Sequence, residues 1–235
     1  MGNAITHVST SMRRRAIGLR YAFTSGRIAS SKCRQARTFE SGLERDFYLL
    51  LEFDADVQRY DTQPVSLNWC DASGDGGRYT PDVLVHYAPD VRRVPTLYEV
   101  KPQAVLKRDW HLFRPRFKAA VKWCRSQGYR FHIIRDIEIR TPFLSNAKFL
   151  LGYTDSRLHI GGAEVLRLRQ EVLLAALDRA GSATPKQLVS AVSTSTAEAA
   201  ELIPYVWNLL AHGRIEADLD QPLTMATPLW SPYES

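Results

Sequence analysis

One pair of segments constrains the fold most: residues 80–85 (TPDVLV) and, seventeen positions after Asp82, the tripeptide Glu99-Val100-Lys101. An apolar run directly follows Asp82 and another directly precedes Glu99, as expected of two neighbouring strands. Residues two apart on a strand face the same way, so Glu99 and Lys101 share a face while Val100 points into the core. Asp82, at the start of its strand, can reach that face across the hairpin. Two carboxylates and one ammonium group are therefore predicted to converge.

Such a group has a defined chemical use. Carboxylate oxygens suit Mg²⁺, with Mn²⁺ as a substitute, and a nearby lysine can orient or help deprotonate an attacking water. We therefore predict Asp82, Glu99 and Lys101 as catalytic residues for phosphodiester hydrolysis. A preceding helix supplies Glu44 as a third carboxylate. The alternative is a solvated hairpin edge, because Asp, Glu and Lys are common and the spacing is loose.

The order of patterns before residue 140 predicts an α/β domain. Ser41 can cap a helix that ends near Phe53. A second helix is expected over residues 114–127, with Pro115 in its first turn and Gly128 as terminator, followed by a strand over residues 129–135. Between the helices, short extended runs are expected to form a meander of antiparallel strands: residues 57–60, 65–69, 78–87 and 96–101.

The remainder of the chain predicts a winged helix-turn-helix domain. A helix over residues 142–151 precedes Gly161 and Gly162, which we interpret as a linker. Three helices and a two-stranded wing follow: helices over residues 165–180, 185–192 and 196–212, and strands over residues 214–219 and 223–226. The predicted organisation is a basic arm (residues 1–38), a nuclease domain (residues 39–160) and a winged-helix domain (residues 161–235).

Charge is distributed unevenly along this chain of 235 residues with net charge +6. Residues 1–170 carry a net charge of +11, whereas residues 171–235 carry −5, so the two parts should have different partners. Residues 1–38 contain eight Lys or Arg, including Arg13 to Arg15, and no acid. This segment is expected to contact phosphates, and the alternative is a solvated tail.

Composition excludes several classes of protein. The three cysteines, Cys33, Cys70 and Cys124, are too far apart for a CxxC zinc or redox site and too few for a disulfide scaffold. No apolar run approaches the roughly 20 residues of a membrane span, and the arginine-rich start lacks the apolar stretch of a signal peptide. We expect a cytoplasmic, DNA-associated protein.

Several motifs in order resemble the TnsA family, the endonuclease subunits of heteromeric transposases in bacteria. The resemblance extends over residues 39–135 and is carried by these segments: residues 39–46 (FESGLERD), 51–54 (LEFD), Tyr60, 63–64 (QP), 79–82 (YTPD) and 98–101 (YEVK). It implies a restriction-endonuclease-like PD-(D/E)xK fold and Mg²⁺-dependent cleavage at the 5′ ends of a transposon during cut-and-paste transposition. The implied partners are double-stranded DNA at the transposon ends, a DDE transposase (TnsB-like) and an AAA+ ATPase (TnsC-like).

The resemblance also implies roles for individual residues. Glu44 and Asp82 match the metal-binding carboxylates of the family, and Glu99 and Lys101 match its strand-borne pair. The backbone carbonyl of Val100 is a further expected ligand. Two other acids of the same helical segment, Glu40 and Glu52, are alternatives to Glu44, although the Ser-x-x-Glu spacing from Ser41 favours Glu44.

Two other functions remain open at this point. One is a structure-selective resolvase or restriction-type nuclease with the same core, and the other is a non-catalytic DNA-binding adaptor. The helix over residues 196–212 contains Glu198 and Glu201 but no Lys or Arg, which disfavours a reader of DNA. We expect residues 165–235 to dock the ATPase or the transposase through excess apolar residues, with completion of the domain's own core as the alternative for Tyr205 and Trp207.

Overall fold

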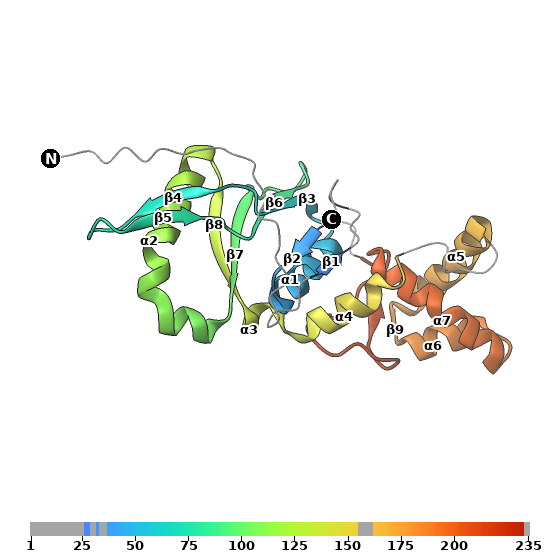
Figure 1. Ribbon diagram of the computed structural model, residues 1–235. Helices are drawn as coiled ribbons and strands as arrows, with labels where there is room; N and C mark the ends of the chain where they lie inside the picture. The colour runs from blue at the N-terminus through green and yellow to red at the C-terminus, as the bar shows by residue number, and fades with distance from the viewer. Residues whose placement is uncertain (1–25, 29–31, 33–36, 155–161, 233–235) are drawn as a thin grey trace. The chain divides into compact units, whose positions relative to one another are not determined.

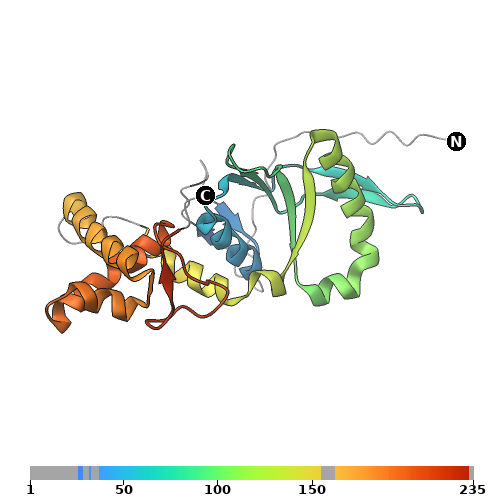
Figure 2. The ribbon, with the colours of Figure 1, turned by 180° about the vertical axis from the view of Figure 1, so that it is seen from behind.

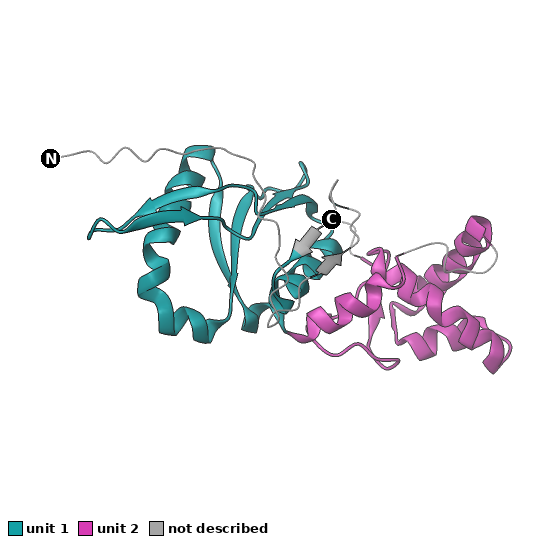
Figure 3. Ribbon diagram, in the orientation of Figure 1, with its two compact units in different colours: residues 1–140 teal, residues 141–235 magenta. Residues whose placement is uncertain are grey.

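The computed structural model describes residues 26–28, 32, 37–154 and 162–232. The chain divides into two compact units, residues 1–140 and residues 141–235 (Figure 3). Most of the predicted basic arm, including Arg13 to Arg15, lies outside the described residues. Within the described residues, no helix combines the length and apolar character needed to cross a membrane.

The described part of unit 1 begins with a strand pair and a capped helix. Strand β1 (Gly26–Ile28) pairs antiparallel with β2 (Arg37–Phe39), and helix α1 (Gly42–Phe53) follows. The Ser41 side chain accepts a hydrogen bond from the backbone N–H of Glu44 (3.2 Å), as the sequence predicted for the N-cap. The helix then buries a stripe of apolar residues at helical spacing: Leu43, Phe47 and Leu51.

The central sheet has the strand order β3-β6-β7-β8 (Figure 1). These strands are Val57–Thr62, Val83–Tyr87, Thr96–Lys101 and Arg130–Arg135, respectively. The neighbours β3, β6 and β7 run antiparallel, whereas β7 and β8 are parallel. Strands β4 (Leu67–Cys70) and β5 (Gly76–Tyr79) form a separate antiparallel hairpin.

The predicted antiparallel meander is therefore wrong, because β3 pairs with β6 and not with its successor in the chain. Residues 78–87 form two strands that are interrupted at Pro81. A proline has no N–H to donate to a ladder, so β5 ends before it and β6 begins after it. Asp82 lies between them and is fixed on both sides: its N–H donates to the Tyr98 carbonyl (3.2 Å) and its own carbonyl accepts from the Gln63 N–H (2.8 Å).

Helix α2 (Gln103–Gln127) begins eleven residues before the predicted start. Its backbone leaves helical angles at Asp109 (φ −111°, ψ 20°), so Pro115 lies within the second helical segment and not in a first turn. Gly128, with φ +71°, ends the helix as predicted. The residues of α2 in the main core of unit 1 are Leu106, Phe117, Ala120 and Cys124.

Helices α1 and α2 cover opposite faces of the sheet (Figure 2). Phe47 of α1 contacts Tyr98, with ring centroids 5.1 Å apart, whereas Leu97 belongs to the core formed with α2. Neighbouring residues of a strand point to opposite faces, which explains this division. Helix α3 (Asp136–Ile139) follows β8, and the next residue, Arg140, donates to the buried carboxylate of Asp46 (3.1 Å).

The described residues of unit 2 form four helices close to the predicted positions. They are α4 (Pro142–Leu151), α5 (Gly162–Ala180), α6 (Pro185–Val192) and α7 (Thr196–Ala211). Helix α5 begins three residues before its predicted start. Gly162 of the predicted linker begins α5, while Gly161 lies outside the described residues. Helix α4 groups with unit 2, so the division falls after residue 140 and not at the predicted residue 160. The reason is a pair of hydrogen bonds to the end of the chain: the Asn146 side-chain amide of α4 donates to the carbonyls of Leu219 (2.8 Å) and Gln221 (2.7 Å).

The strands of unit 2 differ from the predicted hairpin. Strand β9 (Ser182–Ala183) pairs antiparallel with β10 (Leu229–Trp230), and Glu216 forms a bridge to Trp230. The residues expected to return as the second wing strand are held elsewhere, because the Leu223 N–H donates to the Asn146 side chain (3.1 Å). The pairing partner of the 214–219 segment therefore lies further along the chain.

The aromatic residues of α7 complete the core of unit 2. Tyr205 is 8% exposed and Trp207 is 5% exposed. The Trp207 ring stands edge-on to Phe149 of α4, with centroids 5.4 Å apart. The expectation that these two side chains face a partner is therefore wrong for both.

Candidate active site

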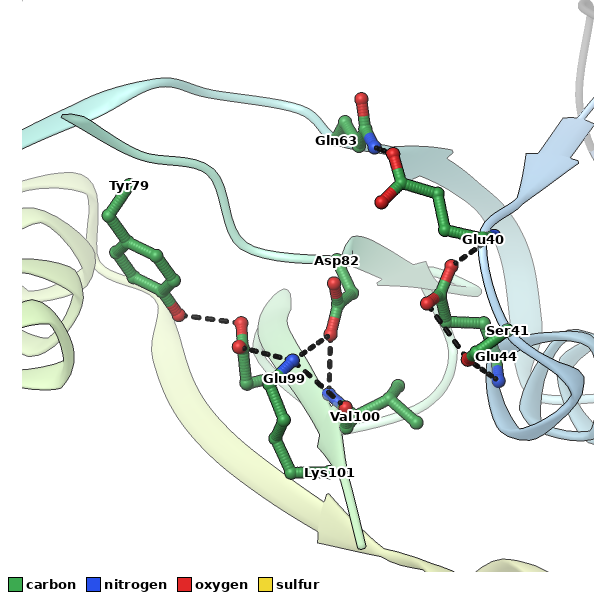
Figure 4. A network of polar contacts seen from close by, with 9 residues as sticks. All are labelled: Glu40, Ser41, Glu44, Gln63, Tyr79, Asp82, Glu99, Val100 and Lys101. Atoms are coloured by element: carbon green, nitrogen blue, oxygen red, sulfur yellow. Dashed lines mark hydrogen bonds and ion pairs between the residues drawn. The ribbon is translucent and has the colours of Figure 1, made fainter. Parts of the chain in front are cut away.

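Asp82, Glu99, Val100 and Lys101 meet at the ends of β6 and β7 (Figure 4). The Lys101 Nζ lies 2.8 Å from Glu99 Oε1 and 3.6 Å from Asp82 Oδ2. It also donates to the backbone carbonyl of Val100 (3.2 Å). The Val100 N–H in turn donates to Asp82 Oδ2 (2.7 Å), which fixes the orientation of that carboxylate. Three oxygen atoms from three residues thus surround one cationic nitrogen.

This cluster holds more negative than positive charge in a poorly solvated place. The Glu99 side chain is 4% exposed and that of Asp82 is 17% exposed. Burial, and then the charge of Asp82, raises the pKa of Glu99 to about 7. Burial likewise raises the pKa of Asp82 above its usual value. A single ammonium group does not balance both carboxylates when they are ionised, so a proton or a further cation would stabilise the site.

Lys101 holds its proton in this arrangement. Burial lowers the pKa of Lys101, but the carboxylates of Asp82 and Glu99 have the larger combined effect and raise it above its ordinary value. An ammonium with a raised pKa is a poor base. Of the two roles that the sequence suggested for this lysine, the geometry favours orienting a reactant over deprotonating it.

Tyr79 belongs to the cluster and was not among the predicted site residues. Its hydroxyl donates to Glu99 Oε2 (2.7 Å), the carboxylate oxygen that Lys101 does not contact. Tyr79 is 7% exposed, and burial, followed by the Glu99 charge, raises its pKa, so it remains a donor. Its position at the end of β5, in the segment leading to Asp82, was the available signal. No periodicity links it to Glu99.

Glu44 lies across from Asp82, and its carboxylate serves as part of the α1 cap (Figure 4). It accepts hydrogen bonds from the Ser41 hydroxyl and the Glu40 N–H, both at 2.9 Å. Burial, and then the charge of Asp82, raises the pKa of Glu44 to about 7. Glu44 is therefore electrostatically coupled to the cluster, although among the described residues no hydrogen bond or ion pair joins it to Asp82 or Lys101.

The two alternatives to Glu44 lie in different surroundings. The Glu52 carboxylate accepts from the Tyr60 hydroxyl (2.8 Å), near the far end of α1. Glu40 accepts from the Gln63 side chain (2.9 Å), and its charge adds a small rise to the pKa of Asp82, behind that from burial. Glu40 is thus the alternative that stays within electrostatic reach of the cluster.

The donor set fits a hard divalent cation. The described residues contain no group of three or more His, Cys, Asp or Glu side chains arranged to hold a metal ion. However, two carboxylates and one backbone carbonyl already converge on the Lys101 ammonium, and oxygen donors of these kinds are the ligands that Mg²⁺ prefers. Asp82, Glu99 and Val100 are the residues that would hold it.

Two family models match the chain. Residues 54–136 match the TnsA-like endonuclease N terminal model, and residues 138–219 match the TnsA endonuclease C terminal model. The chain belongs to the TnsA-like endonuclease family. No curated protein matches it. Membership supports a transposon-associated nuclease, in agreement with the resemblance seen in the sequence motifs.

The family matches include some of the site residues and leave out others. Asp82, Glu99 and Lys101 lie inside the N-terminal match, whereas Glu44 and the rest of α1 before residue 54 precede it. The C-terminal match begins at residue 138, close to the division between the two units at residue 140. The boundary between the two matched regions therefore nearly coincides with the boundary between the two compact units.

Proposed function

We propose that this TnsA-like protein is a Mg²⁺-dependent DNA endonuclease that cleaves the non-transferred strands at the 5′ ends of a transposon. One observation carries the proposal. In a chain of this family, three oxygen atoms surround the Lys101 ammonium: Asp82 Oδ2, Glu99 Oε1 and the Val100 carbonyl oxygen. Family membership supports the nuclease and its connection to transposition. The metal, the strand and the residue roles are the proposed part.

Each residue of the cluster has a separate task in this mechanism. When bound, Mg²⁺ would polarise the scissile phosphate and lower the pKa of an attacking water. Asp82, Glu99 and Val100 hold the cation, and Tyr79 fixes Glu99 by donating to Oε2. Lys101 keeps its proton on Nζ and donates to the attacking oxygen or to a phosphate oxygen, where it offsets developing negative charge.

We assign Glu44 to the same site as a further carboxylate ligand. Its raised pKa and its interaction with the Asp82 charge support this assignment. Its present hydrogen bonds come from Ser41 and Glu40. The carboxylate would have to give up at least part of this capping interaction to contact a cation held by Asp82.

The proposed reaction takes place in a complex with a DDE transposase, an AAA+ ATPase and double-stranded transposon ends. We assign partner docking to unit 2 and interpret α5, β9, α6, α7 and β10 as a winged helix. The support is the element order and the β9–β10 pairing. The net charge of −5 over residues 171–235, and the absence of Lys and Arg from α7, favour a protein partner over DNA for this unit.

Reconstituted cleavage tests the proposal. A plasmid carrying the transposon ends is incubated with the protein alone or with transposase and ATPase, in Mg²⁺ or in EDTA, and the cut strand is mapped. We expect 5′-end cleavage that requires Mg²⁺ and the partners. Asp82→Asn should lose it, whereas Asp90→Asn, which changes an exposed loop carboxylate of the same unit, should keep it. Cleavage in EDTA, or robust cleavage by the lone protein, would refute the metal or the partner requirement, respectively.

A further inference from the structure

A groove of about 530 Å³ lies between α2 and β8, the edge strand of the central sheet. Its walls come only from these two elements, and its lining residues are Trp110, Arg114, Phe117, Lys118, Val121, Lys122, Arg125, Phe131 and Ile133. None of the residues proposed for cleavage is among them. The groove thus needs an explanation of its own.

The floor of this groove is apolar and partly open to solvent. Trp110 is 48% exposed, although its ring contacts Phe117 (centroids 5.9 Å apart). Phe117 is buried and contacts Phe131 of β8 (5.6 Å). Phe131 and Ile133 are only half-buried. Such a floor offers contact area to an apolar side chain and little to a phosphate.

The rim of the groove is cationic. Arg114, Lys118, Lys122 and Arg125 are all exposed, and their spacing of three or four residues places them along one side of α2. No acidic side chain lines the groove. In the described part of the chain, no ion pair joins Arg114, Lys118 or Arg125 to a carboxylate. An occupant should therefore carry negative charge around apolar anchors.

These two properties distinguish among occupants. Residues 1–38 of this chain hold eight basic residues and no acid, so the N-terminal segment has the wrong sign for the groove. Duplex DNA would satisfy the cationic rim but has no side chains to fill the apolar floor. We propose that the groove binds an acidic amphipathic segment of another protein, with aromatic or aliphatic anchors against Trp110 and Phe131. From residue 110 to residue 125 the helix is about 22 Å long, which suits a helical segment of similar length.

A designed peptide can test this with the full-length chain. The probe is a fluorescein-labelled 18-residue amphipathic peptide with Glu on its polar face and Leu and Trp at helical spacing. Two control peptides are a scramble of the same composition and a version with Lys in place of Glu. We expect the acidic amphipathic peptide to bind and both controls to bind more weakly. Trp110→Ala and Lys118→Glu should each weaken binding roughly tenfold or more.

Matched variants separate the groove from a general charge effect. Lys107→Glu makes the same charge change at an exposed position of α2 outside the groove, and Leu112→Ala removes an exposed apolar side chain of α2. Both should bind the peptide like the wild type. Circular dichroism verifies that every variant is folded. Equal weakening by Lys107→Glu and Lys118→Glu would overturn the proposal.

Two further measurements cover the other occupants. If Trp110→Ala weakens duplex DNA binding as much as peptide binding, the groove belongs to DNA and the proposal fails. If sedimentation shows a dimer of the full chain that Trp110→Ala converts to a monomer, a second copy occupies the groove and the proposal fails. We expect neither change. The cleavage assay is a separate readout, since none of the residues proposed for cleavage lines the groove.

Discussion

The two units differ in whether they bury carboxylates. Among the described residues, the buried carboxylates, those of Asp46 and Glu99, both lie in unit 1, while the buried polar side chains of unit 2 are the neutral Asn146, Asn208 and Thr227. The side chains of both asparagines donate and accept hydrogen bonds within that unit. Asn208, for example, donates to the Tyr153 carbonyl (2.5 Å) and accepts from the Gln170 side chain (2.6 Å).

The difference between the buried amides and the buried carboxylates separates side chains that stabilise the fold from side chains that serve function at the expense of stability. A buried neutral amide with both partners in place stabilises the fold and specifies its packing. The Asp82–Glu99–Lys101 cluster has two carboxylates for one ammonium, and the raised pKa values of both carboxylates show that folding disfavours their charged forms. Such a cluster is explained by chemistry that needs negative charge, and not by stability.

The largest expected effect is a loss of DNA cleavage from a substitution in unit 1 that does not destabilise the fold. Asp82→Asn should reduce 5′-strand cleavage in the reconstituted reaction by about 100-fold or more, because even the outer partners of metal ligands contribute 10- to 100-fold. Its free energy of unfolding should be unchanged or higher, since Glu99 and Lys101 then form a balanced pair. Cleavage rates and urea unfolding measure both. A destabilised but active Asp82→Asn protein would mean that Asp82 stabilises the fold and is not needed for cleavage.

The next largest effect is expected in unit 2, where a substitution should lower stability and leave cleavage unchanged. Asn208→Ala leaves the Tyr153 carbonyl and the Gln170 amide without this partner and should lower the free energy of unfolding by about 2 kcal/mol. Cleavage per folded molecule should stay at the wild-type rate, provided that the assay temperature is well below the unfolding midpoint. Urea titration of the full chain gives the stability. A loss of cleavage by folded Asn208→Ala would mean that this amide does more than stabilise unit 2.

A smaller effect should come from the tyrosine that orients Glu99. Tyr79→Phe keeps the ring beside Phe117 but removes the donor to Glu99 Oε2, and should raise the Mg²⁺ concentration for half-maximal cleavage about tenfold. Tyr87→Phe is the matched control, because it removes a hydroxyl that contacts Tyr98 on the central sheet and not Glu99. If both variants respond equally to Mg²⁺, Tyr79 has only a structural role.

The smallest predicted change concerns the basic start of the chain. Deleting residues 1–25 removes four arginines, Arg13, Arg14, Arg15 and Arg20. For each phosphate that the shortened chain no longer neutralises, the slope of log affinity against log salt should fall by about 0.9 for duplex DNA. Gel-shift titrations at several salt concentrations measure the slope. An unchanged slope would assign the segment to a solvated tail.

The convergence of Asp82, Glu99 and Lys101 could be predicted from the sequence because it depends on local geometry, while their catalytic roles stay a prediction. Glu99 and Lys101 are two residues apart on one strand, and Pro81 marks the interruption between β5 and β6 at which Asp82 lies. Tyr79 could not be predicted from spacing. Its contact with Glu99 depends on the course of the β4–β5 hairpin, which no short-range periodicity encodes.

The same division between local and distant interactions explains which parts of the fold could be predicted from the sequence. Ser41 and Gly128 mark helix ends through hydrogen bonds and backbone angles within a few residues, so α1 and the end of α2 were predictable. Strand pairing was not, since β3 skips its neighbour to pair with β6. The unit boundary was also misplaced, because the contacts of Asn146 reach residues more than seventy positions away.

Divalent-cation binding tests the proposal that Asp82 and its neighbours hold a metal ion. The full chain, bound to a DNA duplex whose scissile bond resists cleavage, is titrated with Mn²⁺, and free Mn²⁺ is followed by electron paramagnetic resonance. The wild type and Asn208→Ala should remove Mn²⁺ from solution equally, while Asp82→Asn should bind it about 10- to 100-fold more weakly. Wild-type Mn²⁺ binding by Asp82→Asn would contradict the assignment of the Asp82–Glu99–Lys101 cluster to a metal-dependent nuclease site.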